Sequence, residues 1–583
     1  MDFEPTLLFK KRSLIDRLFM YFEKRSVSDS LFLKICILAV AVSAVWLVIE
    51  WSRDASVEIS TSGGTLIEGV VGTPRFINPV LAVTRADKDM SALIYAGLMR
   101  LGDGGSLVPD VAESITVSDD GLTYDVVLKQ NVYFHDDTQL TAADVVFTIG
   151  HIQNPALTSP HRASFSGVTI EELGEFELNI VLTEPYAPFI ENLTVGILPR
   201  HIWKDATNEE FPFSQHNSEP IGAGPYKVKR IDRNTSGIPE SYVLEPHTAY
   251  HHTVPKIAEL KITFFPNEAL LVNAFNTKMI DSVAGLSAES FDMLTLEDSS
   301  HEILTIPLPR TFALFFNQNK SAVLRDISAR KALDAVIPRA ELIDTVLKGY
   351  GRPLHSPIPE GFGIDTTTYE PTDSSSTPLD TARDILKKGG WTFNSDENEW
   401  TKEVDKVSIP LAVTISTANN PVFESTAEFL RQKWEQLGVH VTVKQFEQSD
   451  LTQGIIRPRD YEALLFGTDL GRSLDFYSFW HSSQRNDPGL NVSLYANLTT
   501  DSILTEARTN ASSTVRTESF IRFSDELLTE TPAIFLYSPE LMYVFPTAVN
   551  GKRFTGLSEP HERFSNIEEW SVETESVWPI FQE

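Results

Sequence analysis

Two kinds of hydrophobic pattern alternate along this chain. Short runs of alternating or consecutive apolar and β-branched residues, such as 65–71 and 124–128, predict β-strands. Five apolar positions between residues 421 and 437 are spaced four and three apart: Phe423, Ala427, Leu430, Trp434 and Leu437. This spacing predicts a helix with one buried face, ending at Gly438 and followed by a period-two strand. Such mixing of strands and helices predicts an α/β or α+β fold.

Turn and cap signals indicate where several elements begin and end. The Asp119-Asp120-Gly121 sequence between two strand-like runs predicts a hairpin turn. Thr141, followed three residues later by Asp144, predicts the start of a helix. Asp380 is predicted to cap a second helix, which ends at Gly389.

Residues 31–51 form a long apolar run interrupted by Lys34, Ser43 and Glu50. A helix of this length matches the roughly 30 Å hydrocarbon core of a bilayer. Basic residues are concentrated before the run, so the positive-inside rule places residues 1–30 in the cytoplasm and the main body outside. We therefore predict an uncleaved, single-pass transmembrane anchor. A cleaved signal peptide is the alternative, although its apolar region would be unusually long and no clear cleavage site follows.

The part of the chain after the anchor begins with a polar segment, residues 52–63, that is predicted to be a short tether. Fully extended, it reaches about 40 Å, so the main body is expected to stay near the membrane. A chain of 583 residues is longer than a single hydrophobic core usually supports. We therefore expect two or three lobes.

The formal net charge of −31 argues against one class of partner. Nucleic-acid binding requires clustered cations, and no block of Lys and Arg follows residue 34. Cys36 is the only cysteine, which excludes an intrachain disulfide and a CxxC metal site.

The sequence lacks the common signatures of catalysis. There is no HExxH, GxSxG or SxxK motif, and no Walker A or GxGxxG motif. His251 and His252 are adjacent, and on a strand neighbouring side chains point to opposite faces, which does not suit shared metal binding. We therefore predict that the protein is not an enzyme and needs no cofactor.

Four segments resemble, in order, the extracytoplasmic solute-binding proteins of the peptide ABC-transporter family (family 5, the oligopeptide- and dipeptide-binding group). They are residues 96–149 with the sequences VPDVAES, FHDD and LTAADV, the GAGPYKV segment at 222–228, residues 314–353, and residues 480–508 with HSS and NVSLYAN. Three positions depart from the family pattern: Asp137, Pro338 and Leu498.

The resemblance implies a two-lobed clamshell with an extra third domain, which encloses its ligand between the lobes. The implied boundaries are 64–90, 217–308 and 535–583 for a discontinuous lobe I, 91–216 for the extra domain and 309–534 for lobe II.

The resemblance also implies a ligand site around the sequence LLFGTDLGRSLDFYSFW, residues 464–480. In the peptide binders an aspartate just after an apolar strand pairs with the α-amino group of the ligand, and Asp469 is at the matching position. A buried ammonium group needs such a carboxylate partner. Five further residues are expected at the site: Phe466, Phe476, Tyr477, Trp480 and Asn491.

Alternatives remain open for several of these residues. Asp469 could instead cap a turn or pair with Arg472, and Asp475 competes for the same place in the comparison. Asn491 could equally organise a turn.

The function implied is that of an extracytoplasmic receptor that captures peptides and delivers them to the permease subunits of an ABC importer. The same fold could bind another solute, such as an oligosaccharide or a metal chelate. It could also serve as a sensor or assembly protein without transport.

Overall fold

The computed structural model describes residues 27–54, 57–296, 300–362, 364, 377–404 and 406–577. Most of the predicted cytoplasmic segment, residues 1–30, lies outside this range, as do parts of the predicted tether and lobes. The chain divides into two units, Met1–Thr61 with Glu573–Glu583, and Ser62–Val572.

The first unit contains a helix and a pair of strands. Helix α2 (Val27–Asp54) includes the predicted anchor, residues 31–51. Strand β1 (Val57–Thr61), in the predicted tether, pairs antiparallel with β23 (Glu573–Val577). Among the described residues, none of the helices combines the length and hydropathy needed to span a bilayer. The transmembrane anchor therefore stays a prediction.

The second unit is built on a large mixed sheet, to which twelve strands of the described residues belong. Ten of them follow one path, in this order: β20 (His440–Phe446), β19 (Ala412–Ala418), β21 (Ala463–Asp469), β14 (Arg310–Phe316), β22 (Ala533–Pro546), β12 (Ser282–Ala284), β2 (Gly63–Val71), β11 (Ile257–Phe265), β10 (Pro239–Pro246) and β9 (Tyr226–Arg233). Two further strands, β13 (His301–Pro307) and β15 (Gly351–Pro353), also pair with β22.

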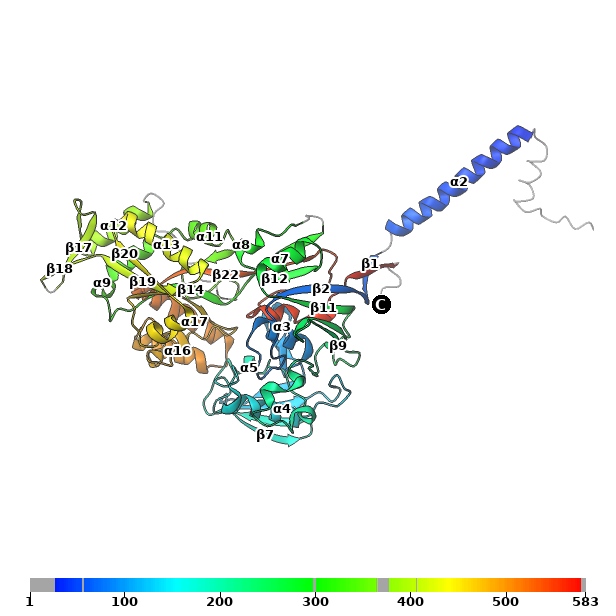
Figure 1. The fold of residues 1–583 in the computed structure, drawn as a ribbon, viewed down its shortest axis with the longest axis horizontal. Coiled ribbons are helices and arrows are strands. Elements are labelled where there is room, and N and C mark those ends of the chain that lie inside the picture. The colour runs from blue at the N-terminus through cyan, green and yellow to red at the C-terminus, as the bar shows by residue number, and fades with distance from the viewer. Residues whose placement is uncertain are drawn as a thin grey trace, which may run out of the picture. The chain divides into compact units, whose positions relative to one another are not determined.

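Strand β22 joins the two halves of this sheet. Its first residues pair with β14 and β15, and its last residues pair with β13 and β12. Figure 1 shows β22 extending from the neighbourhood of β14 and β19 towards β12 and β2. One continuous strand therefore contributes to both halves.

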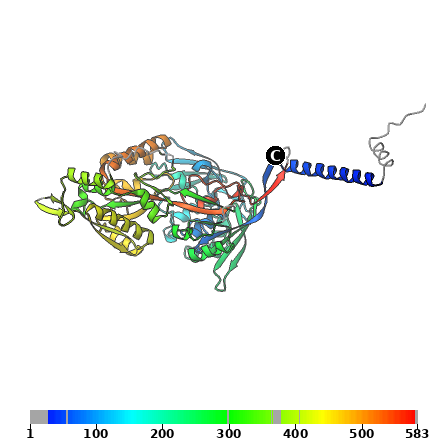
Figure 2. The same ribbon diagram turned by 90° about the horizontal axis from the view of Figure 1, so that it is seen from above.

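Helices cover both faces of the half that contains β14, β19 and β21, as Figures 1 and 2 show. One core lies beneath α10 (Ile327–Ala335), α11 (Arg339–Val346), α12 (Pro378–Lys388) and α13 (Pro421–Leu437). A second core includes side chains of α15 (Tyr477–Trp480), α16 (Leu498–Thr509) and α17 (Ser513–Glu530). The predicted buried stripe of α13 is confirmed, because Ala427, Leu430, Trp434 and Leu437 are buried there and Phe423 packs against them.

A smaller antiparallel sheet lies within the predicted extra domain. Its strand order is β5 (Ala112–Val117), β6 (Thr123–Leu128), β8 (Glu177–Val181) and β7 (Thr169–Gly174), and helix α4 (Ala142–Gln153) packs with it. The predicted hairpin between β5 and β6 is confirmed, and so is the capping box of Thr141 and Asp144. The core of this region is continuous with side chains from β2, β10 and β11.

The remaining strands and helices are short. The strands are β3 (Met99–Leu101), β4 (Leu107–Pro109), β16 (Thr392–Asn394), β17 (Glu399–Val404) and β18 (Val407–Pro410). The helices are α3 (Arg85–Ile94), α5 (Phe189–Asn192), α6 (Arg200–Trp203), α7 (Glu268–Asn276), α8 (Ala288–Phe291), α9 (Ala322–Arg325) and α14 (Gln448–Asp450).

One predicted helix start is wrong. Helix α12 begins at Pro378, and its cap is Thr377, whose hydroxyl accepts a hydrogen bond from the backbone of Asp380. Proline is well suited to the first helical position because its missing N–H is not needed there. Asp380 therefore lies in the first turn rather than ahead of it.

Candidate functional site

Asp469 occupies the end of β21, where the strand leaves the hydrophobic core. The first residues of β21 are buried, Phe466 and Gly467 are half-buried, and Asp469 is exposed. Opposite Gly467, the ring of Phe312 on β14 lies so close that an added Cβ would be 3.0 Å from it. The strand thus begins in the core and ends with an exposed carboxylate.

The carboxylate of Asp469 has two partners of its own. Its Oδ2 accepts a hydrogen bond from Nε of Arg310, 3.0 Å away, on the opposing position of β14. Its Oδ1 accepts one from the backbone N–H of Gly471, at 3.2 Å. The side chains of Arg310 and Asp469 are 33% and 44% exposed. Because a carboxylate offers about four lone-pair positions, Asp469 retains capacity for another donor.

Arg472, the alternative partner expected for Asp469, binds elsewhere. Its guanidinium donates to the carbonyls of Gly105 and Gly556 at 2.9 and 2.5 Å, and to the carboxylate of Glu562 at 2.6 Å. Gly105 and Gly556 approach each other so closely that a Cβ on either would meet the other backbone. Arg472 therefore ties the loop after β21 to two segments far away in the sequence.

One cavity adjoins this loop and another adjoins Arg310. Gly471 and Arg472 line one of about 330 Å³, together with residues from the segments 95–101, 191–196 and 558–565. Arg310 lines another of about 380 Å³. Lys88, Glu559 and His561 line both cavities, although Asp469 itself lines neither. The Arg310–Asp469 pair thus lies at the edge of a polar, recessed region.

Glu191 is a second carboxyl group in this region. It lines the smaller cavity, and its Oε1 accepts a hydrogen bond from the hydroxyl of Ser473. Burial raises the pKa of Glu191 to about 7, against the opposing effect of the Ser473 hydrogen bond. Its charge therefore changes near neutral pH.

Asp475, the other candidate aspartate, lies in a different environment. Its carboxylate accepts a hydrogen bond from Ser478 and lies 3.7 Å from the guanidinium of Arg508. Burial raises the pKa of Asp475, although Arg508 acts to lower it. Arg508 also covers the rings of Tyr477 and Tyr186 at 4.3 and 4.9 Å. Asp475 is thus tied into a cluster of side chains.

The four predicted aromatic contacts are placed differently from one another. Phe476 and Trp480 are buried and pack against Phe523 of α17, so neither offers surface to a ligand in this structure. Phe466 and Tyr477 are only partly buried. Tyr477 stacks on His481 and lines a cavity of about 530 Å³ with Asp475 and Arg508.

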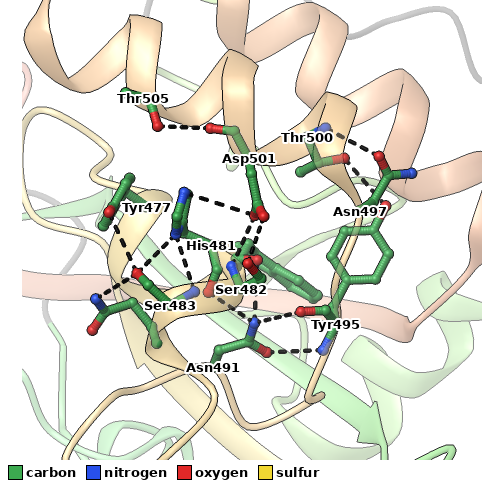
Figure 3. Close-up of polar contacts among 12 residues, drawn as sticks. Tyr477, His481, Ser482, Ser483, Asn491, Tyr495, Asn497, Thr500, Asp501 and Thr505 are labelled. Carbon is green, nitrogen blue, oxygen red and sulfur yellow. Dashed lines mark hydrogen bonds and ion pairs between the residues drawn. The ribbon is translucent and has the colours of Figure 1, made fainter.

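Asn491 is fully buried and organises the loop after α15 (Figure 3). Its side-chain nitrogen donates to the carbonyls of Tyr495 and Trp480 at 2.9 and 3.2 Å. Its side-chain oxygen accepts from the backbone of Tyr495. In the same region, Ser482 donates to Asp501 of α16 through both backbone and hydroxyl. Figure 3 shows that these groups face one another. The hydrogen bonds of Asn491 agree with its alternative role, in which it organises a turn.

The sequence reasoning missed the partners of these residues. It did not identify Arg310, which is 159 positions from Asp469 and becomes its neighbour only through strand pairing. It also rejected the His251–His252 pair, which the structure places against Asp110. The presence of both histidines in one short segment was the only local signal.

Comparison with known proteins identifies the family. Residues 106–488, more than half of the chain, match the model for bacterial extracellular solute-binding proteins, family 5 Middle. The chain belongs to this family. The resemblance to this family is therefore confirmed, and the model that matches describes solute-binding proteins.

Individual relatives cover nearly the whole chain. The oligopeptide-binding protein AppA of Bacillus subtilis is 24% identical over 519 residues, covering 87% of this chain and 91% of AppA. The structure of that AppA in complex with a nonapeptide covers 88% of this chain and 100% of its own, with a TM-score of 0.64 and 23% identity. The structure of NikZ from Campylobacter jejuni in complex with Ni(L-His) covers 87% and 99%, with a TM-score of 0.64 and 24% identity. These structural matches confirm the periplasmic-binding-protein type of mixed α/β fold.

Proposed function

We propose that this family 5 protein is a membrane-anchored extracytoplasmic receptor that captures peptides and delivers them to an ABC importer. The family and the oligopeptide-binding relative support the ligand class. The observation that carries the proposal is the exposed carboxylate of Asp469 at the end of β21, whose hydrogen-bond partners Arg310 and Gly471 each line a cavity. A carboxylate so placed is suited to receive the ammonium group of a peptide.

The proposed clamshell has lobe I at 64–90, 217–308 and 535–583, an extra domain at 91–216 and lobe II at 309–534. Strand β22 supports a connection between the two lobes, because it pairs with strands of both. Arg472 of lobe II contacts Gly105 of the extra domain and Glu562 of lobe I, so the cavity beside it is formed by all three. Ligand-dependent closure would change these contacts.

At the proposed site, the ligand ammonium competes with Arg310 for Asp469. Asp469 has acceptor positions for both groups, but both are cations and repel each other. Each therefore weakens the binding of the other. Phe466 and Tyr477 are the proposed apolar contacts, because their side chains are partly accessible. The loop that carries Tyr477 is held in place by three residues that do not contact the ligand: Phe476, Trp480 and Asn491.

The proposed anchor rests on the apolar residues 31–51 and the basic residues before them. Lys34 lies near one end, where its long side chain can reach the interface. Alkaline carbonate extraction of cell membranes tests this part of the proposal. The full-length chain should remain in the membrane pellet, whereas recovery in the carbonate supernatant would exclude the anchor.

The ligand class can be tested directly on the full chain. The protein is purified from cells in mild detergent, with no ligand added. It is then denatured, and the small molecules that it releases are identified by mass spectrometry. A set of short peptides with varied side chains is expected, because a site that recognises the main chain selects weakly among side chains. Release of a single sugar would contradict the peptide assignment.

A metal chelate is the second candidate ligand. It is favoured by the similarity to NikZ, whose structure contains Ni(L-His). Elemental analysis of the same released fraction distinguishes the two candidates. If nickel is released in equimolar amount with a single amino acid, the assigned ligand is a metal chelate instead of a peptide. The proposed receptor function and the fold would be unchanged.

A further inference from the structure

Three side chains suited to metal binding converge away from Asp469. Asp110 lies between β4 and β5, and His251 and His252 lie beyond the end of β10. Oδ1 of Asp110 accepts a hydrogen bond from Nε2 of each histidine, and both distances are 2.8 Å. The two imidazole rings are 4.5 Å apart, and one donor atom from each of the three residues lies within 4.8 Å of the others.

The two histidines converge because they do not belong to a strand. Strand β10 ends at Pro246, and the backbone N–H of Tyr250 then donates to the carbonyl of His247 at 3.0 Å, forming a turn. The bend at residues 251–252 brings both rings to the same side. This overturns the expectation of opposite faces, which holds only for extended strand backbone.

The cluster is buried but can be reached by a small ion. The side chains of His251 and Asp110 are 1% and 6% exposed, whereas that of His252 is 20% exposed. Asp110 and Tyr250 also line the cavity of about 330 Å³ next to Arg472. An ion can therefore approach past His252 or from this cavity.

Two neighbouring cations, Arg100 and Lys129, hydrogen-bond to groups other than the Asp110 carboxylate, although their charges also act on it. Arg100 pairs with Glu568 at 2.5 Å, and Nζ of Lys129 donates to the backbone carbonyl of Asp110 rather than to its carboxylate. The contacts of the Asp110 carboxylate found among the described residues are those with the two imidazoles.

We propose that Asp110, His251 and His252 bind a divalent transition-metal ion, for which Zn²⁺ is the probe. Two imidazoles and a carboxylate are ligands that suit Zn²⁺ and related ions, with bonds of about 2.0–2.2 Å. Such bonds place donor atoms about 3.4 Å apart in tetrahedral geometry, so donors now 2.8 Å apart need only a small separation. The ion takes the place of the two hydrogens now shared with Asp110, and each imidazole then carries its hydrogen on Nδ1.

Three protein ligands leave one coordination position for water or another small ligand. The site does not depend on the nature of the transported solute, because its residues are separate from Asp469 and Arg310. It joins the segment before β5 to the loop after β10, which belong to the proposed extra domain and lobe I. Bound metal therefore stabilises the junction of these two parts.

Zinc titration of the chelator-treated, untagged full chain in detergent tests the site. We expect one Zn²⁺ per chain, and at least tenfold weaker binding in Asp110→Asn and in His252→Gln. His201→Gln is the matched control, because His201 also pairs with an aspartate, Asp136, at 2.7 Å but has no second imidazole there. This control should bind Zn²⁺ like the wild type. Failure of the wild type to bind stoichiometrically, or unchanged affinity in both site variants, would overturn the proposal.

X-ray absorption spectroscopy of the zinc-loaded wild type gives a test that does not require any variant to fold. The expected first shell contains two imidazole nitrogens and oxygen ligands. A first shell with fewer than two imidazoles would show that Zn²⁺ binds elsewhere and would also overturn the proposal.

Discussion

Two arginine–carboxylate clusters in this protein are built in opposite ways. Arg563 is completely buried and makes two hydrogen bonds of 2.7 Å to Asp89 and one of 3.1 Å to Glu68. Arg310 makes one hydrogen bond to Asp469 at the surface, where both side chains remain partly exposed.

The carboxylates of the buried cluster have few acceptor positions left for further hydrogen bonds. Glu68 also accepts from the hydroxyls of Ser282 and Tyr543. Burial acts to lower the pKa of Arg563, but Asp89 and Glu68 together hold it above its ordinary value. Burial likewise acts to raise the pKa of Asp89, and Arg563 holds it below its usual range. Arg563 and Asp89 thus stabilise each other's charge, because each supplies the partner that the other loses on leaving water.

The two clusters differ in how many acceptor positions of their carboxylates remain open. A buried carboxylate whose acceptor positions are filled holds the fold together and has nothing to offer a ligand. A carboxylate at a strand end, with one guanidinium and one N–H as partners, can still exchange or add a donor. The prediction that Asp469 binds a ligand rests on this difference as well as on the family position.

The largest effect is expected from removing the central cation of the buried cluster. Arg563→Met should lower the free energy of unfolding by about 3–5 kcal/mol, because Asp89 and Glu68 would lose the guanidinium that binds both, and only Arg85, 3.7 Å from Asp89, would remain as an ion-pair partner among the described residues. Chemical denaturation of the full chain measures the change. Lys320→Met, which removes the exposed pair of Lys320 with Asp460 at 2.9 Å, is the control and should leave stability unchanged. Similar losses in the two variants would invalidate the distinction between the clusters.

The next effect should appear in binding rather than stability. Asp469→Asn should weaken peptide binding about 100-fold, since the ligand ammonium would lose its charged partner. The unfolding free energy should change by less than about 1 kcal/mol, as for other exposed pairs. Calorimetry with the peptides released from the native protein measures the affinity. Asp475→Asn is the control, and a larger loss in that variant would transfer the role to Asp475.

The carboxyl group of Glu191 is intermediate between the two clusters in burial. It should make the free energy of unfolding depend on pH. Its pKa of about 7 lies above the ordinary value of 4.5, so the folded protein binds more protons between these values than the unfolded one. The contribution of Glu191 is therefore fully present below pH 4.5 and is lost as pH rises through 7. It should amount to on the order of 2 kcal/mol.

Denaturation at several pH values, with Glu191→Gln as the comparison, isolates this contribution. The stability of the wild type relative to the variant should fall as pH rises from about 4.5 to 7. A difference that is independent of pH would show that the carboxyl group of Glu191 titrates in the same way in the folded and unfolded chain.

The smallest effect is expected from Arg310. Arg310→Gln should tighten peptide binding a few-fold, because the competing cation is removed from Asp469. A double-mutant cycle with Asp469→Asn measures the coupling of the two residues. Weaker binding in Arg310→Gln would mean that the arginine orients the carboxylate for the ligand instead of competing with it.

The local elements were predictable because their signals are contained in short stretches of sequence. The stripe of α13, the hairpin at 119–121 and the cap at Thr141 each depend on residues close together in the chain. The position of Asp469 at a strand end followed from the apolar run before it and from the family resemblance. These features need no knowledge of what the element packs against.

Contacts between distant segments were not predictable in the same way. The pairing of β1 with β23, and of Arg310 with Asp469, depends on strand register across long separations. Phe476, Tyr477 and Trp480 are similar in type, and packing against distant elements, such as α17 and β22, decides which of them are buried. The convergence of His251 and His252 depends on a bend between Pro246 and Pro255, and these prolines mark the end of the strand without specifying where the rings point.

Strand β22 also determines the order in which the protein can be completed during its synthesis. It is the last strand of the large sheet along the chain, yet β14 and β12 both need it as a neighbour. Until residues 533–546 have been made, each half of the sheet has an open edge that could pair with another chain. Neither half can therefore finish folding before this strand has been made. Chains that stop before β22 should therefore be prone to aggregate.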